Sequence, residues 1–392
     1  MDVLIIGGGA SGIMAALSAA ENKSNSVVLL ERQSRIGRKL LSTGNGRCNL
    51  TNTSAFEGHY HGEEPSFASY ALEHFPPHDC LEYFERLGLL CTEQYGGRVY
   101  PFSDSANSVL DVLRFALDSS GVQTVTSACV QGVTVSGGRF RAGCADSSYE
   151  SDRLIVACGG MAGGKVGGVS DGYDILKSLG HKCTKLYPAL VPIYTDDEYT
   201  RSLKGVRCQA SVALGSLKSE GELQFVEKGI SGPAAFDISR KAAVERGCLD
   251  IDLLPGTDDI FPILLNRQQT MPRLECGSLL TGILHNRLGM VIIKYSGLRP
   301  SQTIGELTEN QLKIISTNCK HFRLEIRGVG NFDSAQVSAG GISTKDFNPE
   351  TMGSLIVPGL YACGEVLDVD GDCGGYNLRW AWASGRLAGM LG

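Results

Sequence analysis

The chain has 392 residues, 42% of them hydrophobic and 20% charged, which is the composition of a globular protein with more than one core. Its net charge of -6 gives no electrostatic reason to expect nucleic acid as a partner. Thirteen scattered cysteines without a Cys-x-x-Cys pair indicate reduced thiols in a cytoplasmic protein, and exclude a disulfide framework or a zinc site.

The N-terminal segment predicts a βαβ unit of about 30 residues. Residues 2–6 predict a buried parallel strand, residues 10–21 a helix and residues 26–31 a second buried strand. The apolar start superficially resembles a secretory signal, but Asp2 replaces the positive charge that such a signal needs. No stretch is long and apolar enough to span a membrane, so we expect no membrane partner.

The loop between the first strand and the helix reads Gly7-x-Gly9-x-x-Gly12. Gly7 permits a tight turn, Gly9 lets the backbone approach a pyrophosphate, and Gly12 allows close packing of helix on strand. The helix N-terminus then attracts the anion. Glu31 ends the second strand 19 residues after Gly12, where a carboxylate can bind the ribose of an adenosine. Together these features predict a dinucleotide site.

A polar stretch with two glycine turns follows. Arg38 and Lys39 face the diphosphate, an anionic substrate or solvent. The run Ser42-Thr43-Gly44-Asn45-Gly46 can bring backbone N–H groups against a planar ring, although a plain turn has the same composition. The rest of this half predicts two helices, at 78–88 and 105–119, and four strands, at 122–128, 130–136, 138–142 and 153–157.

One motif imitates an ATP-binding loop. Gly159-Gly160-Met161-Ala162-Gly163-Gly164-Lys165 matches Gly-x-x-x-x-Gly-Lys, but Val166 stands where a P-loop needs Ser or Thr to hold Mg²⁺. We therefore interpret the segment from Cys158 as a turn that passes beside the cofactor, and ATPase chemistry is not expected.

The middle of the chain has a different character. Short strands are predicted at 186–193, 209–214 and 248–253, with the spacing of a barrel, and another at 322–326. Residues 258–318 have a mainly helical pattern, and glycine-rich α/β character returns after about 335. We expect a nucleotide domain that is interrupted by an inserted β-rich domain.

A second glycine-rich loop lies near the C-terminus. An apolar strand at 360–363 leads to Gly364-Glu365, where a carboxylate can bind the polyol chain that a flavin has and a nicotinamide cofactor lacks. Gly374-Gly375-Tyr376-Asn377 precedes a helical pattern, whose N-terminus can hold the negative charge that develops on a reduced flavin. An ordinary C-terminal helix with a glycine-rich lead remains the alternative.

Several reactive side chains have simpler interpretations. Cys48 and Cys373 lie in cofactor-facing loops, but cysteine is commonly a small buried hydrophobe, and we favour that interpretation over a redox dithiol. His59 and His61 provide only two ligands, so no metal is expected, and His181 is interpreted as structural.

Two long motifs carry a resemblance to a known family. Residues 37–52, from Gly-Arg-Lys-Leu-Leu-Ser-Thr-Gly to Cys-Asn-Leu-Thr-Asn, and residues 364–377 resemble the BaiN/YhiN-type bacterial flavoproteins. These are often described as NAD(P)/FAD-dependent oxidoreductases or aminoacetone-oxidase-like proteins. Segments 229–234 and 332–337 also look like family segments, so the resemblance spans nearly the whole chain.

The resemblance implies a fold and a cofactor. The fold is α/β, a Rossmann-like FAD-binding domain of the two-dinucleotide-binding-domain type at 1–186 and 333–392. It is interrupted by a β-barrel-like middle domain at 187–332, which has a small helical insertion at about 257–318. Tightly bound FAD and a cytoplasmic bacterial location are also implied.

The predicted FAD-binding residues come from both glycine loops and the segments between them. They are Gly7, Gly9, Ala10, Ser11, Gly12, Glu31, Arg32, Arg38, Lys39, Thr43, Gly44, Gly46, Val130 through its backbone, Ala157, Gly159, Gly364, Glu365, Gly375, Tyr376 and Asn377. The segment after Ala157 departs from the family pattern. The side-chain hydroxyls of that pattern are missing at Cys158, Gly168 and Val169, and one is gained at Ser170, so its contacts with flavin or substrate are expected to differ.

The expected activity is reduction of an activated C=C bond of the enone type in a small molecule, driven by NADH or NADPH. A steroid or bile-acid-like compound is a specific option, because some relatives are linked to bile-acid double-bond reduction. A second Rossmann fingerprint is absent, so the nicotinamide would bind transiently at the flavin face.

Two other functions remain open: an oxidase that uses O₂ on amines or aminoketones, and a flavin-binding redox sensor. A tRNA-modifying flavoprotein would share the N-terminal motif but should have a basic surface, and this chain is acidic. The sequence names no proton donor and no oligomeric state. Arg47, Tyr376 and residues 55–65 are candidates to line the pocket.

Overall fold

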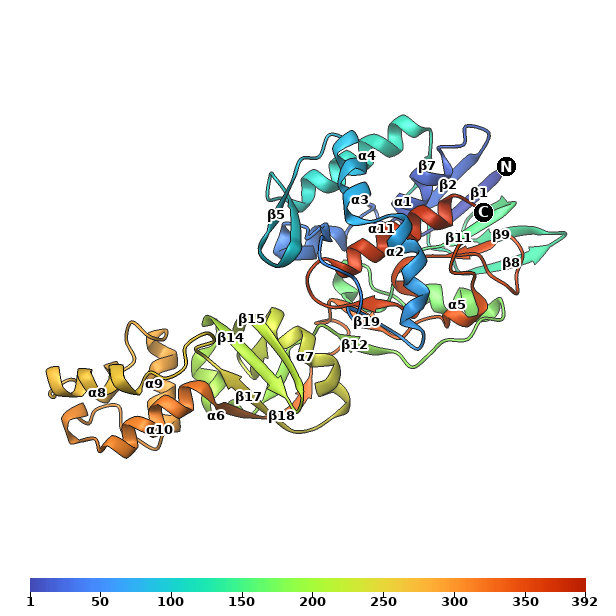
Figure 1. Ribbon diagram of the computed structural model, residues 1–392. Coiled ribbons are helices and arrows are strands. Elements are labelled where there is room, and N and C mark those ends of the chain that lie inside the picture. The colour runs from blue at the N-terminus through green and yellow to red at the C-terminus, as the bar shows by residue number, and fades with distance from the viewer. The chain divides into compact units, whose positions relative to one another are not determined.

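The computed structural model describes the backbone of residues 1–392 and every side chain except those of Tyr95 and Asp197. The chain divides into two compact units. Unit 1 comprises Met1–Pro188 and Ala335–Gly392, and unit 2 comprises Ala189–Ser334. Unit 1 therefore contains both ends of the chain (Figure 1). The sequence analysis placed the two boundaries two residues earlier, at 186/187 and 332/333.

A five-stranded sheet forms the centre of unit 1. Its order is β20-β11-β1-β2-β7, and every adjacent pair is parallel. The strands are β1 (Asp2–Ile6), β2 (Ser26–Leu30), β7 (Gln123–Val125), β11 (Arg153–Val156) and β20 (Leu360–Ala362). The chain adds β2 and β7 on one side of β1, and β11 and β20 on the other. The strand order thus reverses at β1, and ligands of open α/β sheets bind beyond the carboxyl end at such a point.

Two helices from opposite ends of the sequence pack against each other in unit 1. They are α1 (Ala10–Ala19) and α11 (Tyr376–Gly389). Gly385 and Gly389 lie one turn apart on α11, and a Cβ at either position would overlap a carbonyl oxygen of α1, that of Ser11 or that of Ala15. Glycine at both positions is therefore what lets the two backbones approach so closely. The other helices of unit 1 are α2 (Ser69–His74), α3 (Pro77–Arg86), α4 (Ala106–Ser120) and α5 (Asp171–Ser178).

Small antiparallel sheets complete unit 1. One contains β8 (Gly132–Ser136), β9 (Arg139–Gly143) and β10 (Ser148–Ser151), and another contains β3 (Thr51–Asn52), β5 (Cys91–Gln94) and β6 (Arg98–Pro101). A two-stranded pair joins β4 (Tyr60–His61) to β21 (Asp370–Gly371). This pair brings the 55–65 loop to the second glycine loop. Another two-stranded sheet pairs β12 (Tyr187–Ala189) with β19 (Val337–Ala339).

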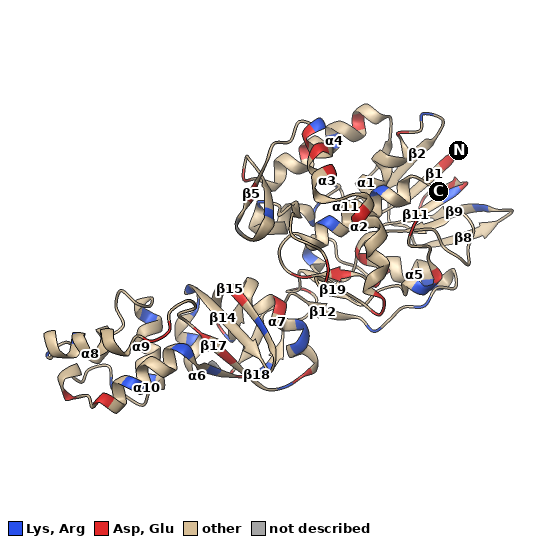
Figure 2. Ribbon diagram, viewed as in Figure 1, with Lys and Arg blue, Asp and Glu red and all other residues tan. Residues whose placement is uncertain are grey.

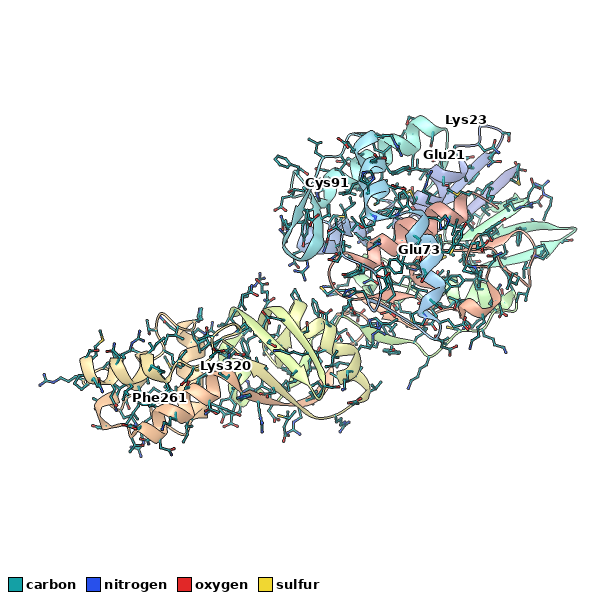
Figure 3. The ribbon with its side chains drawn as sticks, viewed as in Figure 1. Glu21, Lys23, Glu73, Cys91, Phe261 and Lys320 are labelled. Carbon is teal, nitrogen blue, oxygen red and sulfur yellow. The ribbon has the colours of Figure 1, made fainter. Side chains whose placement is uncertain are left out.

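Unit 2 is a closed six-stranded barrel with helices. The barrel contains β13 (Ile193–Thr195), β14 (Arg207–Leu214), β15 (Leu217–Val226), β16 (Gly229–Ser231), β17 (Cys248–Asp252) and β18 (Phe322–Val329). Its helices are α6 (Asp197–Thr200), α7 (Pro233–Val244), α8 (Phe261–Thr270), α9 (Asn286–Tyr295) and α10 (Glu309–Lys320). Lys320 joins α10 to the barrel, because its Nζ lies 2.8 Å from Asp252 Oδ2 (Figure 3). The predicted fold class, an FAD-type α/β domain with an inserted barrel, is confirmed.

Some predicted elements were wrong in detail. The run 186–193 was predicted as one strand but forms β12 and the start of β13, because Leu190 adopts φ +52° between them. Pro188 and Pro192 flank that residue and lack the N–H that a continuous strand would need. The strand β15 and the helix α7 were not predicted at all.

Charged residues of both signs are distributed over the chain. Basic and acidic residues are interspersed along the ribbon of both units (Figure 2). Unit 2 has as many Lys and Arg as Asp and Glu. Among the residues that the structure describes, no helix combines the length and the apolar character needed to cross a bilayer.

Candidate functional site

The first glycine loop connects β1 to α1 at the reversal point of the sheet. Gly7 adopts φ +111°, and its N–H donates to the Leu30 carbonyl of β2 over 2.8 Å. A Cβ at Gly7 would overlap the Ala157 carbonyl oxygen, and one at Gly12 would overlap the carbonyl oxygen of Gly7. Both glycines are thus required by the packing of the protein itself.

At position 9, by contrast, neither the backbone angles nor the packing of the protein requires a glycine. Gly9 has ordinary extended angles at the N-cap of α1, and a Cβ there would meet nothing within 4 Å among the described atoms. No side chain caps this helix, and its first turn has no acidic residue. Open space above a glycine, next to an uncapped helix N-terminus, fits the pyrophosphate of a dinucleotide. The residues present therefore fit FAD at this loop.

Glu31 lies directly beside this loop. Its Oε2 accepts a hydrogen bond from the Gly8 N–H at 2.8 Å, and its Oε1 accepts from the Gln33 N–H at 2.7 Å. These contacts orient the carboxylate at the end of β2, where it was predicted to bind ribose. The Ala128 N–H binds the Glu31 carbonyl at 2.9 Å, which places the buried Val130 segment next to the same strand end.

Two predicted cations bind protein groups. Arg32 Nη1 lies 2.8 Å from Asp171 Oδ2, at the start of α5. Arg38 Nη1 donates to Gln33 Oε1 at 2.6 Å, and its Nη2 donates to the Lys165 carbonyl at 3.3 Å. Both arginines therefore contact the segment that follows β11, and any contact with FAD stays a prediction.

The two glycine loops meet in space, although they are about 350 residues apart in sequence. Lys39 Nζ lies 2.6 Å from Glu365 Oε2, with side-chain exposures of 31% and 18%. Glu365 Oε1 accepts from the Ser338 N–H at 2.8 Å. Gly364 adopts φ +76° directly against Ser11, so closely that a Cβ would overlap the serine side chain. The residues predicted for the ADP half and for the flavin half thus adjoin each other.

Two asparagine side chains, one next to the loop and one from β3, hydrogen-bond to the backbone of the second glycine loop. Asn377 Oδ1 accepts from the Gly371 N–H at 2.8 Å, and its Nδ2 donates to the Gly371 carbonyl at 2.7 Å. Asn52 Nδ2 donates to the Gly374 carbonyl at 2.8 Å. Gly375, with φ +104°, is the N-cap of α11, and Tyr376 is the first residue of this helix. Asn377 therefore shapes the loop, and its predicted contact with FAD remains untested.

The segment after β11 does not form a P-loop helix. Gly159 adopts φ +70°, and only a short 3₁₀ turn at Gly164–Val166 follows before α5 begins at Asp171. A Cβ at Gly160 would lie 2.6 Å from Ser338 Oγ and 2.7 Å from Glu365 Oε1. This glycine turn, with Ala157 at its start, therefore lies against the carboxylate of the second loop.

The Thr43–Gly46 turn is tight and left-handed. Gly44 and Asn45 both adopt φ +57°, and Gly46 adopts φ +87° with no described atom within 4 Å of a Cβ there. Thr43 Oγ1 donates to the Leu40 carbonyl at 2.7 Å. Cys48 follows, fully buried, and burial raises the pKa of its thiol to about 12.

That burial predicts an unreactive Cys48. A thiol with this pKa has almost no thiolate at pH 8, and only the thiolate reacts with alkylating reagents. We expect iodoacetamide at pH 8 to label exposed Cys129 in the native protein and to leave Cys48 unlabelled, as read by peptide mass spectrometry. Labelling of Cys48 at a rate similar to Cys129 would instead support the redox-dithiol alternative.

The sequence analysis missed a polar cluster at this site. His59 and His61 hydrogen-bond to the two oxygens of Asp372, which lies in the second glycine loop. Sequence had shown only two histidines without a third ligand. Among the described residues no group of three potential ligands is arranged for a metal ion. The separation of more than 300 residues left no local signal for this contact.

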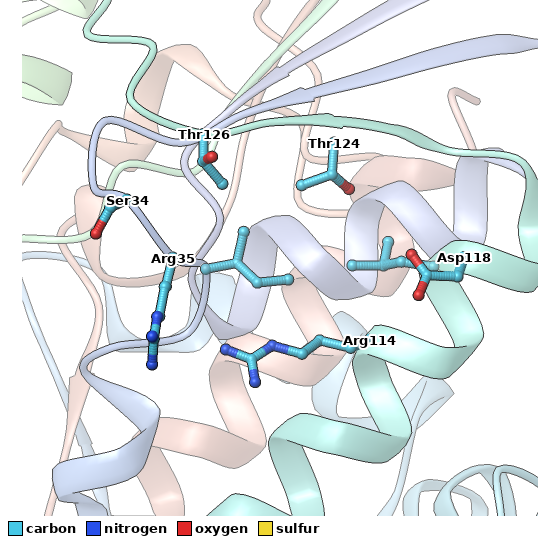
Figure 4. A pocket seen from close by; sticks show the side chains of 8 residues that line it. Ser34, Arg35, Arg114, Asp118, Thr124 and Thr126 are labelled. Atoms are coloured by element: carbon cyan, nitrogen blue, oxygen red, sulfur yellow. The ribbon is translucent and has the colours of Figure 1, made fainter.

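A separate surface pocket of roughly 360 Å³ lies between α4 and β7 (Figure 4). Arg35, Arg114, Thr124 and Thr126 are among its lining residues. None of the described residues that line it belongs to either glycine loop. We assign no role in the candidate site to this pocket.

Comparison with known proteins covers the whole chain. Residues 1–391 match the family described as HI0933-like protein Rossmann domain. A 3-dehydro-bile acid delta(4,6)-reductase of Clostridium scindens is 39% identical over an alignment of 400 positions. The alignment covers 98% of this chain and 97% of the reductase. A ribosomal RNA dihydrouridine synthase of Haemophilus influenzae is 29% identical, over 97% of this chain and 96% of the synthase.

A solved structure shows the same fold. The FrdA chain of E. coli quinol fumarate reductase matches with a TM-score of 0.50 at 15% identity, over 99% of this chain and 69% of that one. At that identity the likeness concerns the fold alone. The family match and the reductase relative confirm the predicted flavoprotein class and support FAD as its cofactor. The chain belongs to the HI0933-like Rossmann domain family and is a flavin-dependent oxidoreductase.

Proposed function

We propose that this protein uses NADH or NADPH to reduce a carbon–carbon double bond conjugated to a carbonyl in a small molecule. The observation that carries the proposal is the whole-chain similarity to a bile acid delta(4,6)-reductase, at 39% identity. The name of that relative describes double bonds in conjugation with a 3-oxo group. A steroid-like enone is therefore the first substrate class to test.

The second relative supports the same reaction type. Dihydrouridine differs from uridine by two hydrogens across the C5–C6 double bond, which is conjugated to the C4 carbonyl. Both named relatives thus act on an electron-poor double bond, although one substrate is a steroid acid and the other an RNA base. Conjugate reduction is the chemistry that the two have in common.

The residues of the chain suit this chemistry. Bound FAD, once reduced, supplies the hydride. The uncapped N-terminus of α1 and the Lys39 ammonium favour the negative charge of the diphosphate. The N-terminus of α11, at Gly375 and Tyr376, would favour the negative charge that develops on a reduced flavin bound there. A second dinucleotide fingerprint is absent from the sequence, so we propose that the nicotinamide binds transiently at the flavin face.

Anaerobic stopped-flow mixing with NADH and with NADPH tests the proposal. We expect fast bleaching of the FAD absorbance by at least one of them, followed by reoxidation on addition of a 3-oxo-4,6-diene bile acid. No bleaching by either nucleotide would contradict the proposal. Bleaching by an amine or aminoketone instead, followed by reoxidation with O₂, would favour the oxidase alternative. The absence of both reduction and reoxidation would favour a redox sensor.

Reduction of a uracil in ribosomal RNA is the second candidate function. The synthase relative favours it, since the alignment covers nearly all of both chains. The net charge of -6 and the balanced charges of unit 2 oppose it, because RNA binding relies on excess Lys and Arg. Reoxidation of the bleached protein by a ribosomal RNA fragment, with formation of dihydrouridine detected by nucleoside mass spectrometry, would select this candidate.

A further inference from the structure

Two histidines share one carboxylate beside the second glycine loop. Asp372 Oδ2 lies 2.9 Å from His59 Nδ1, and Asp372 Oδ1 lies 2.6 Å from His61 Nε2. The side chains of His59 and His61 are 40% and 32% exposed, and that of Asp372 is 25% exposed. Solvent or a ligand can therefore reach both rings. We refer to these three residues as the His–Asp–His cluster.

The carboxylate of the cluster is ionised. Burial of Asp372 disfavours its charge, but the hydrogen bonds from His61 and His59 outweigh this and hold the pKa of the carboxyl below its usual range. An ionised carboxylate can only accept hydrogen bonds. His59 Nδ1 and His61 Nε2 must therefore both carry hydrogen. The second nitrogen of each ring is left to exchange a proton with a ligand or with solvent.

The cluster is attached to the start of α11. The His59 ring stacks on the Tyr376 ring with a centroid distance of 4.3 Å and an angle of 17°. Tyr60 Oη donates to the Tyr376 carbonyl at 2.9 Å. Asp372 also donates its N–H to the His59 carbonyl at 3.0 Å, directly beyond the end of the β4–β21 pair. His59 is thereby fixed to the helix N-terminus that is proposed to face the flavin.

Two phenols and several charged groups surround the cluster. Burial raises the pKa of the Tyr60 and Tyr376 phenols, so neither is a competing anion at neutral pH. The buried Arg379 guanidinium donates to the Ser54 carbonyl at 3.0 Å. The other charged groups on neighbouring segments include Arg98, Glu57, Glu63 in its ion pair with Lys345, Glu64, Asp368 and Asp370.

We propose that His59 donates the proton that completes reduction of the substrate double bond, with Asp372 and His61 as positioning residues. The proposal rests on the proposed function. His59 is chosen because it is the more exposed of the two rings and stacks on the first residue of α11. Its Nδ1 is engaged by Asp372, so Nε2 is the donor atom.

Hydride from the reduced cofactor forms a C–H bond at one carbon of the double bond and carries both electrons of the reduction. The π pair of the double bond then forms the second C–H bond, at the carbon next to the carbonyl, with the proton of His59 Nε2. One N–H bond breaks, the imidazolium becomes a neutral imidazole, and solvent returns the proton. The carboxylate of Asp372 stabilises the imidazolium before the transfer.

A structural role is the competing explanation, because the cluster also joins β4 to β21. Removal of a structural ion pair would lower the thermal unfolding midpoint and leave both half-reactions intact in the folded protein. Loss of a proton donor would slow only the half-reaction in which the substrate accepts hydrogen. The two explanations therefore separate in a half-reaction experiment.

The experiment compares His59→Gln, Asp372→Asn and, as a control, the exposed His78→Gln, all as full-length protein loaded with FAD. In His59→Gln we expect the rate of flavin bleaching by NADH or NADPH to stay within about twofold of that of the original protein. The rate of flavin reoxidation by a 3-oxo-4-ene steroid should fall by about 100-fold or more, because the proton donor is lost. Asp372→Asn should slow reoxidation by about 10-fold, and His78→Gln should change neither rate.

A spectroscopic measurement tests the cluster independently of activity. The ¹⁵N NMR shifts of the ring nitrogens at pH 8 should show hydrogen on His59 Nδ1 and His61 Nε2, and Asp372→Asn should abolish this uniform pattern. Unchanged reoxidation in His59→Gln, or the opposite tautomer on His59, would overturn the inference. If the unmodified protein bleaches but no enone reoxidises it, the proposed function fails instead, and the ring spectra still report whether the cluster is built as described.

Discussion

Replacement of Gly12 by alanine is expected to abolish the retention of FAD. The added Cβ would overlap the carbonyl oxygen of Gly7, and neither atom can rotate away because both are fixed to the backbone. The start of α1 would have to move away from β1, which distorts the loop that is predicted to hold the pyrophosphate. Overpacking of this kind costs about 1–3 kcal/mol or more, so the flavin-to-protein ratio should fall to about a tenth of normal or less.

Gly9→Ala is the matched comparison. Gly9 has φ −84° and ψ −171°, which alanine adopts freely, and its added Cβ would meet no described atom within 4 Å. The protein without FAD should therefore unfold at the same temperature as the original. If the pyrophosphate approaches this backbone, the methyl group should still weaken FAD binding by about tenfold or more.

Two measurements separate the effects of these variants. Flavin absorbance after denaturation gives the FAD content, and thermal unfolding of the FAD-free protein gives the stability of the chain alone. We expect Gly12→Ala to lower both the FAD content and the stability of the FAD-free protein. Gly9→Ala should lower only the FAD content. Normal FAD affinity in Gly9→Ala would show that the pyrophosphate lies elsewhere, whereas a stable, flavin-rich Gly12→Ala would contradict the packing of α1 on β1.

The parts of the fold that could be predicted are those with local signals. β1, α1 and β2 occupy nearly the predicted residues, because a strand that is buried on both faces is a continuous apolar run and the glycine turn marks its end. The barrel was recognised from the spacing of short strands. The close α1–α11 contact was not, because glycines at 385 and 389 resemble helix breakers unless the partner helix is known.

Two elements were missed, for different reasons. β15 begins Leu217-Lys218-Ser219-Glu220-Gly221, where polar residues and a glycine hide a strand that is stabilised by pairing with β14 along its length. The helix α7 begins at Pro233, directly after a left-handed Gly232. In β15 tertiary pairing outweighs local propensity, which a single sequence cannot show. In α7 the proline at the first helical position and the alanine-rich sequence are local helix signals that the sequence analysis overlooked.

The contacts of the candidate site were the least predictable feature. Sequence suggested separate roles for Lys39 and Glu365, one at the diphosphate and one at the polyol, but not that their side chains touch. It also provided no reason to pair the His59 loop with Asp372. Both contacts depend on how the first and last segments of the chain come together around β1, and that information is long-range.

The Lys39–Glu365 contact leads to the second large expected effect. The Glu365 carboxylate accepts from Lys39 Nζ with one oxygen and from the Ser338 N–H with the other. Glu365→Ala would leave a partly buried ammonium and a backbone N–H without their acceptors, at the junction of the two glycine loops. Charge-assisted hydrogen bonds contribute about 1.5–3 kcal/mol, so the dissociation constant of FAD should rise by about 10- to 150-fold.

Glu365→Gln and Glu21→Gln complete the series. Glutamine keeps an acceptor for Ser338 but loses the charge that faces Lys39, so its FAD affinity should lie between those of the original protein and Glu365→Ala. Glu21 forms a comparable 2.8 Å ion pair with Arg386 but is 55% exposed, so its replacement should change FAD affinity by less than about threefold. Flavin fluorescence titration of the FAD-free proteins measures all three. If Glu365→Ala binds FAD as tightly as the original protein does, the meeting point of the two loops is not part of the cofactor site, and the flavin half must be held by the start of α11 instead.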